Sequence, residues 1–282
     1  MQRKRSKLKT ALISALVLAV VVLSGGLAWT INFGAEYLTS WSGCECSGNG
    51  LSYTDNQINM FSNKMTSLGH TKSFKFSNQN TWSADVTEDR DFNGIDWLYG
   101  DGVTMFAFSG HGSAGTDSSG HQTFTAPFCK ASGSASCEFS AERARLGEKV
   151  GYYAAPHTGN LRYMMWLTCY SVHTDPMYQW SQTMNIGLDY VMGYRGTSAD
   201  SLTTDEVPRD WAKKAMRSSD PWRFKKAWFW AIEDWWVNDT GSLIASGKTE
   251  NEAIDRRNKY RRTWAGPHTD SHTWYAWAWH KG

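Results

Sequence analysis

The sequence lacks a clear excess of charge of either sign. It has 29 lysines and arginines against 27 aspartates and glutamates, which gives a formal net charge of +2. Five of the basic residues lie within the first nine positions, so the rest of the chain has 24 basic and 27 acidic residues and a net charge of −3. Binding to nucleic acid requires a basic surface that neutralises phosphates. We therefore expect no nucleic-acid partner.

Internal repeats and linker-like stretches are also absent after the N-terminal segment. Residues 29–282 are therefore expected to form a single domain, and a domain of this size can bury a large core. Hydrophobic residues make up 41% of the chain and charged residues 20%, which is typical of a globular protein rather than a disordered one.

The N-terminus has the pattern of a signal peptide. Basic residues in 3–9 precede an apolar run at 11–23, and Gly26-Leu27-Ala28 supplies the small residues that signal peptidase recognises. We expect residues 1–28 to be removed and the remaining chain to be secreted or otherwise extracytoplasmic. The alternative is an uncleaved membrane anchor, although the apolar run is short for a span. Any membrane contact is expected through this segment.

Cysteine is scarce and odd in number, with Cys44, Cys46, Cys129, Cys137 and Cys169. An exported protein favours disulfides, and an odd count leaves one thiol over. The first four cysteines lie in loop-like surroundings, whereas Cys169 ends an apolar run. We expect the first four to pair in some order and Cys169 to stay free. Cys44 and Cys46 are too close to pair with each other, which favours bridges to Cys129 and Cys137.

Strand and helix patterns alternate along the chain. Apolar and alternating runs predict strands at 29–38, 71–76, 103–109, 163–169 and 188–194. Helical spacing predicts helices from Thr54 or Asp55 to Gly69, and at 140–149, 176–186, 221–237 and 248–262. A long loop is expected at 113–140 and a Trp-rich tail at 268–280. This order predicts an α/β fold with a mainly parallel central sheet.

Two apolar runs end at chemically reactive residues. Residues 105–109 precede Gly110-His111-Gly112, and residues 163–167 precede Thr168-Cys169. Such runs are typical of buried parallel strands, whose carboxyl ends are where open sheets bind ligands. If the two strands are neighbours, His111 can act as the base that activates the Cys169 thiol, with the amides of Gly112 and Cys169 as oxyanion donors. The alternative is an inert core cysteine and a structural loop histidine.

These motifs resemble those of a known clan. Ser109-Gly110-His111-Gly112 and Thr168-Cys169, each after an apolar block, resemble the catalytic motifs of the caspase–gingipain–legumain clan of cysteine peptidases. More closely, the chain resembles a family of exported bacterial proteins of unknown function with that core. The residues that carry this second resemblance are Gly34-Ala35-Glu36-Tyr37, Tyr53-Thr54-Asp55, Phe108 to Gly112 and Val191-Met192-Gly193-Tyr194.

The resemblance implies a caspase-like three-layer α/β sandwich that hydrolyses amide bonds in a protein or peptide substrate. It gives His111 the role of base, Cys169 that of nucleophile, and the amides of Gly112 and Cys169 that of the oxyanion hole. The chain departs from the clan at Leu167, where Glu or Gln is common, and at Tyr170-Ser171, where Gly is common. The substrate specificity is therefore left open.

Residues after the strand at 188–194 are further candidates for a substrate pocket. Arg195 and Asp200 hold this place by analogy with the fold alone.

Metal sites have weaker support, and no other cofactor is expected. Asp89, Asp91 and Asn93 match the first half of a calcium loop, but Gly100 occupies the place of its bidentate glutamate. A polar turn is the alternative. A zinc site could draw on His111, His121, His157 and His173 with Asp117 or Asp175. The chain lacks the HExxH motif and paired histidine spacing that would favour zinc.

Tryptophan is abundant, with 16 residues. Exposed tryptophans make broad, rigid platforms for sugars and peptides, so Trp235-Trp236 and the group Trp274, Trp277 and Trp279 suggest a second function. In this alternative, a catalytically inactive protein of the same fold acts as a surface or cell-wall binding module. Tail histidines His268, His272 and His280 could suggest a metal, but a polar tail is the simpler interpretation.

Overall fold

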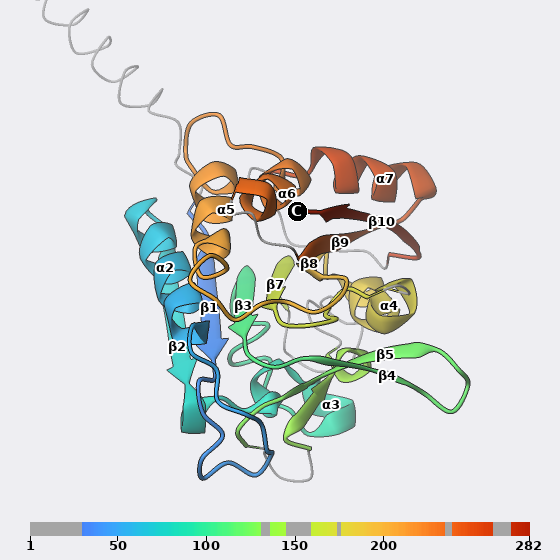
Figure 1. Ribbon diagram of the computed structural model, residues 1–282. Helices are drawn as coiled ribbons and strands as arrows, with labels where there is room; N and C mark the ends of the chain where they lie inside the picture. Colours follow the sequence, from blue (N-terminus) through green and yellow to red (C-terminus); the bar gives the residue numbers. More distant parts are fainter. Residues whose placement is uncertain (1–29, 131–135, 145–158, 174–175, 235–238, 262–271) are drawn as a thin grey trace, which may run out of the picture. The chain divides into compact units, whose positions relative to one another are not determined.

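A seven-stranded sheet forms the centre of the computed structural model (Figure 1). The structure describes residues 30–130, 136–144, 159–173, 176–234, 239–261 and 272–282. The strand order is β10-β9-β8-β7-β3-β1-β2. Within Ile31–Gly282, which is one compact unit, these strands are β1 (Asn32–Tyr37), β2 (Thr71–Ser77), β3 (Met105–Ser109), β7 (Tyr163–Leu167), β8 (Tyr190–Tyr194), β9 (Thr240–Gly247) and β10 (Trp274–Lys281).

Parallel pairing dominates the sheet. β2, β1, β3, β7 and β8 run parallel to one another, while β9 and β10 pair antiparallel. Helix α2 (Thr54–Ser67) connects β1 to β2, and α4 (Pro176–Ile186) connects β7 to β8, because parallel neighbours need a crossover connection. The predicted α/β class with a mainly parallel central sheet is confirmed.

The two faces of the sheet have different covers. One face packs against α2, α5 (Val207–Ala215) and α6 (Phe224–Asp234). The other packs against α4 and a small antiparallel sheet, which consists of β4 (Ser113–Thr116), β5 (Gln122–Pro127) and β6 (Glu138–Ser140). Helix α7 (Glu250–Lys259) follows β9, and the short elements are η1 (Asn78–Asn80), η2 (Ser83–Val86), α3 (Asp89–Phe92) and η3 (Ala141–Arg143). This arrangement is compatible with a three-layer sandwich.

Strand β3 shows how the sequence selects this arrangement. All five of its residues are buried. Successive side chains of a strand point to opposite faces, so Met105 and Ala107 join the core beneath α2, whereas Phe106 and Phe108 join the core beneath the small sheet. A strand covered on both faces is therefore apolar, and the one polar residue of β3, Ser109, donates a hydrogen bond to Gln57.

Trp166 of β7 organises the second core. Its ring stacks on Phe139 of β6 at a centroid distance of 4.6 Å and meets Phe124 of β5 edge-on at 5.4 Å. Phe108 of β3 lies 5.2 Å away on the same face. Aromatic contacts of this kind bury large apolar areas, so they fix the small sheet against the large one.

The prediction of a loop at 113–140 is wrong, because this segment forms the strands of the small sheet. β5 alternates Phe124 and Ala126, which are buried, with more polar residues, whereas all of β4 is exposed. The serines and glycines of this region concealed the short apolar alternation that forms the strand.

Sequence reasoning also missed α5, β9 and β10. β9 consists mostly of small residues that lack the β-branched signal of a strand, and β10 pairs with it where a terminal tail was expected. Of the helix expected at 140–149, the structure describes only η3 and Ala144.

The disulfide prediction is confirmed. Cys44 bonds to Cys129 and Cys46 to Cys137, while Cys169 remains a free thiol. Two disulfides are typical of an extracellular environment. In the described ranges, no helix is long and apolar enough to cross a membrane. The proposed leader at 1–28 lies outside these ranges, as do His157, Asp175, Trp235, Trp236 and His268.

Candidate functional site

The carboxyl ends of β3 and β7 lie side by side. The strands pair in parallel with Ser109 opposite Leu167, and His111 and Cys169 each follow two residues later. A Cβ added to Gly112 would lie only 2.4 Å from the carbonyl oxygen of Cys169 and 2.9 Å from Thr168 Cβ. The two strand ends are therefore in direct backbone contact, which requires glycine at position 112.

His111 and Cys169 line one small cleft of about 40 Å³. Helix α2 closes the cleft through Thr54 and Gln57. The hydroxyl of Thr54 donates to the Leu38 carbonyl at 2.8 Å, and Ser109 donates to the Gln57 side-chain oxygen. These buried hydrogen bonds tie the start of α2 to the ends of β1 and β3, and so they position the cleft wall.

Loop 39–51 holds the His111 ring. His111 Nε2 lies 2.8 Å from the carbonyl oxygen of Asn49, and the ring packs on Trp41 at a centroid distance of 4.8 Å. A carbonyl can only accept, so Nε2 carries the proton and donates, and in the neutral imidazole Nδ1 keeps the basic lone pair. The disulfides at Cys44 and Cys46 anchor this loop.

The Cys169 sulfur is held by the backbone of Ser198. The Ser198 N–H donates to Sγ at 3.2 Å, and the thiol lies 3.6 Å from the Ser198 carbonyl oxygen. Burial raises the pKa of the Cys169 thiol, the Ser198 N–H partly offsets this, and the nearby Asp239 carboxylate raises it further. The resting sulfur is therefore a neutral thiol, since the thiolate is disfavoured at neutral pH.

Asp239 lies at the back of the Cys169 environment. Its side chain accepts from the Ala199 N–H at 3.0 Å, and burial raises the pKa of its carboxyl. Sequence reasoning missed Asp239, Ser198, Asn49 and Trp41. Backbone groups carry no residue-type signal, and Asp239 lies near Cys169 only because β9, itself unpredicted, lies beside β8.

The two predicted pocket residues have separate roles. Asp200 lines the cleft, where its carboxylate accepts from the N–H groups of Ser52 and Tyr53 at the start of α2. Arg195 instead lies over the rings of Trp277 and Trp279, at 5.4 and 4.5 Å from their centroids. The structure therefore brings Asp200, but not Arg195, into the cleft that holds Cys169.

A larger groove of about 600 Å³ shares His111 with the cleft. It runs between loop residues 45–49 and the segment His111–Ser113, with Pro127 and Glu138 on its far side. His111 therefore lines both the small cleft and the larger groove.

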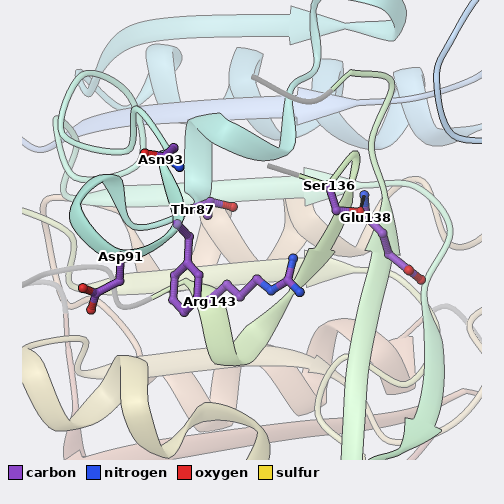
Figure 2. A pocket seen from close by; sticks show the side chains of 7 residues that line it. Thr87, Asp91, Asn93, Ser136, Glu138 and Arg143 are labelled. Carbon is purple, nitrogen blue, oxygen red and sulfur yellow. Dashed lines mark hydrogen bonds between the residues drawn. The ribbon is translucent and has the colours of Figure 1, made fainter. Parts of the chain in front are cut away.

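Two of the three calcium candidates lie at a different cavity, of about 230 Å³, which Asp89 does not line (Figure 2). Asp91 and Asn93 line it, but the Asp91 carboxylate points away from the other labelled side chains, and the cationic Arg143 also lines the cavity. Arg143 lies 5.9 Å from the Phe92 ring centroid. A fixed cation opposes a second cation, so this geometry gives the calcium interpretation no support.

The zinc candidates have other partners. His121 stacks on Tyr178, and His173 contacts the Gln122 side chain. Within the described ranges, no group of three or more His, Cys, Asp or Glu side chains could hold a metal ion. His272 is buried against Ser246 and Arg256 in the core, rather than in a polar tail.

The C-terminal tryptophans lie on β10. Trp274 and Trp279 are each 48% exposed, while Trp277 donates from Nε1 to Ser242 at 2.8 Å. The strand is at the end of the sheet order, so two of the three predicted platform residues are accessible.

Together these features define an α/β protein with a free thiol and an imidazole at adjacent strand ends, in a chain whose other cysteines form disulfides. The chain belongs to the family described as Domain of unknown function (DUF6345), whose model matches residues 38–279. The match covers both strand ends. A search of curated proteins found no match.

Proposed function

We propose that this protein is an exported cysteine hydrolase of peptidase type, which cleaves amide bonds through Cys169 with His111 as its base. The observation that carries the proposal is the shared cleft at the ends of β3 and β7. A nucleophile, a base and a third group that orients the base are the usual components of such a site, and the Asn49 carbonyl is the third group.

The chemistry follows from the tautomer of His111. As Sγ attacks the substrate carbonyl carbon, the thiol proton moves to Nδ1, and the imidazolium stays bound to Asn49 through Nε2–H. His111 then returns the proton to the leaving amine, which departs as the C–N bond breaks and leaves a thioester. Water attacks this thioester with His111 again as base, which releases the acid and restores the thiol.

Backbone donors support the charged states of this cycle. The Ser198 N–H favours a developing thiolate at Sγ, and the amides of Gly112 and Cys169 are the proposed oxyanion donors. The raised pKa of Cys169 means that the thiolate forms only as the proton is transferred. The groove beside His111 would hold the peptide, and the protein is proposed to be secreted before it acts.

Labelling with a peptidyl electrophile tests the proposal. We expect such a probe to modify Cys169 in the folded, oxidised protein, and the labelling rate to fall at least about tenfold in His111→Ala because base catalysis is lost. His121→Ala is the matched control, since its ring stacks on Tyr178 away from the cleft. Equal labelling of wild type and His111→Ala, or a rate no faster than for the unfolded chain, would overturn the dyad.

A second function has its own observation. The accessible Trp274 and Trp279 on the outer strand support a binding module for cell-wall or surface ligands in which Cys169 does no chemistry. In that case Cys169→Ala retains binding to isolated cell walls, whereas a Trp274→Ala, Trp279→Ala double variant loses it. If the double variant binds like wild type, this second function is excluded.

A further inference from the structure

A cavity with aromatic walls lies beside β2, separate from the cleft of Cys169. It has a volume of about 260 Å³ and is lined by Phe76, Asn80, Trp82, Asp85, Ile95 and Tyr99. Phe76 and Tyr99 meet edge to face at 5.1 Å. We call it the aromatic cavity. Its rings are partly exposed, while Asp85 is buried.

One carboxyl group, that of Asp85, lines the aromatic cavity, and a second carboxyl interacts with it. Asp85 interacts with Glu36 of β1, and Glu36 pairs in register with Phe76, so it projects from the same face of the sheet. Glu36 has no exposed surface, and its buried carboxyl interacts with that of Asp85. In the part of the chain that the structure describes, no lysine, arginine or histidine pairs with either carboxyl.

The carboxyl pair is costly without a compensating cation. An unpaired buried charge is strongly destabilising, and a group in this position takes up a proton instead. Burial raises the pKa of Glu36 well above its usual value, and the Asp85 charge raises it further. Burial also raises the pKa of Asp85 to about 7. Glu36 therefore favours its neutral, protonated form, whereas Asp85 can release its proton to solvent near neutral pH when a cation binds beside it.

The walls favour one chemical class of cation. Three ring-bearing residues offer π faces and edges to an alkylated nitrogen, which is how proteins recognise quaternary ammonium groups. A metal ion would need several oxygen ligands, whereas the cavity supplies mainly carbon surface and one carboxylate. An anionic ligand would be repelled by the Asp85 carboxylate.

We propose that the aromatic cavity binds a small alkylammonium cation, with its alkyl groups against Phe76, Trp82 and Tyr99 and its charge opposite Asp85. This site is independent of the Cys169 cleft and of the hydrolase function. Because Asp85 must be ionised to attract the cation, binding releases a proton. The titratable groups near Asp85 are Glu36 of β1 and Tyr99 of the cavity wall.

Calorimetric titration of the full chain, with its disulfides intact, tests the charge requirement. The ligands are choline, tetramethylammonium and the uncharged analogue of choline in which a tert-butyl group replaces trimethylammonium. We expect saturable binding of both cations at about pH 8, about tenfold weaker at about pH 6, since Asp85 is then mostly protonated. Binding of the neutral analogue as tightly as choline, or no saturable binding of either cation, overturns the proposal.

Variants test the location. Asp85→Asn keeps the side-chain shape, and we expect it to weaken choline binding at least about tenfold and to remove the pH dependence. Trp82→Leu removes one wall. Asp205→Asn is the matched control, because Asp205 is a buried carboxyl with a raised pKa outside the aromatic cavity. Thermal unfolding of each variant verifies folding, and unchanged binding in folded Asp85→Asn contradicts the proposed site.

Discussion

The Cys169 cleft and the aromatic cavity begin from neighbouring residues of the same strands. Glu36 of β1 pairs with Phe108 of β3, only three positions before His111. In both places burial raises the pKa of an acidic group. They differ in what faces that group. A backbone N–H faces the Cys169 sulfur, whereas a second carboxyl faces Asp85.

This difference separates two uses of burial. At the cleft, a fixed donor favours an anion that exists only transiently during reaction, which is how preorganised dipoles contribute to catalysis. At the aromatic cavity, burial disfavours the Asp85 anion, so the site holds either a proton or a cation. The experiments below separate the two places by perturbing one and measuring both.

The largest effect is expected from the disulfide that anchors the cleft. Cys44→Ser with Cys129→Ser opens a bridge across 85 residues, and we expect the free energy of unfolding to fall by about 2–5 kcal/mol. Loop 39–51 also carries Asn49 to His111. Denaturant unfolding measures the loss, and probe labelling should lose its dependence on His111. Ser47→Ala, in the same loop, is the control. If choline binding falls as much as labelling of Cys169, the Cys169 cleft and the aromatic cavity are not independent.

The aromatic cavity should dominate the pH dependence of stability. The folded state holds the Asp85 proton up to about pH 7, but the unfolded chain loses it near its usual pKa. The contribution of this proton to the free energy of unfolding is fully present below about pH 4. It is lost as the pH rises through about 7, and the free energy of unfolding falls by about 2–4 kcal/mol. Denaturant unfolding across this range should show the fall in wild type and a flatter profile in Asp85→Asn. A wild-type profile that rises over the same interval would contradict the assignment.

The scaffold could be predicted because its signal is local. β3 and β7 are buried at every position, so apart from Ser109 each is an apolar run that the sequence displays directly. The free thiol followed from the odd cysteine count, and the short spacing of Cys44 and Cys46 favoured bridges to Cys129 and Cys137, whose order only the structure shows. These features depend on residue type and spacing alone.

The surroundings of the site could not be predicted because they depend on tertiary contacts. The Asn49 carbonyl and the Ser198 N–H exist in every peptide, so only the fold selects them. Asp239 precedes a strand of small residues with no strand signal. Glu36 and Asp85 are 49 positions apart, and a pair of distant carboxyls has no sequence pattern that predicts their contact.

A smaller effect is expected at the contact between the two strand ends. In Gly112→Ala the new methyl group would meet the Cys169 carbonyl, so the strand ends must shift, at a cost of about 1–3 kcal/mol in unfolding free energy. Probe labelling of Cys169 should fall further than stability, because the displaced amide belongs to the proposed oxyanion hole.

Gly196→Ala is the matched control for this change, since nothing lies within 4 Å of an added Cβ there. It should leave labelling unchanged. Choline binding at the aromatic cavity should be unaffected by either alanine variant. If Gly112→Ala labels Cys169 at the wild-type rate, the amide of residue 112 has no part in the reaction.

The smallest effect is expected at the outer strand, where neither kind of burial operates. Arg195 lies 4.5 Å from the ring centroid of Trp279, and that ring is 48% exposed. Exposed cation–π contacts contribute only about 0.5–1 kcal/mol, so Trp279→Ala should reduce the free energy of unfolding by no more than this amount. Labelling of Cys169 and choline binding should both be preserved. Trp222→Ala, which removes a ring that contacts lysines instead of an arginine, is the comparison for stability. A larger loss of unfolding free energy would mean that Trp279 supports the fold. A small loss together with failure to bind cell walls would give β10 a binding role, which neither the Cys169 cleft nor the aromatic cavity shares.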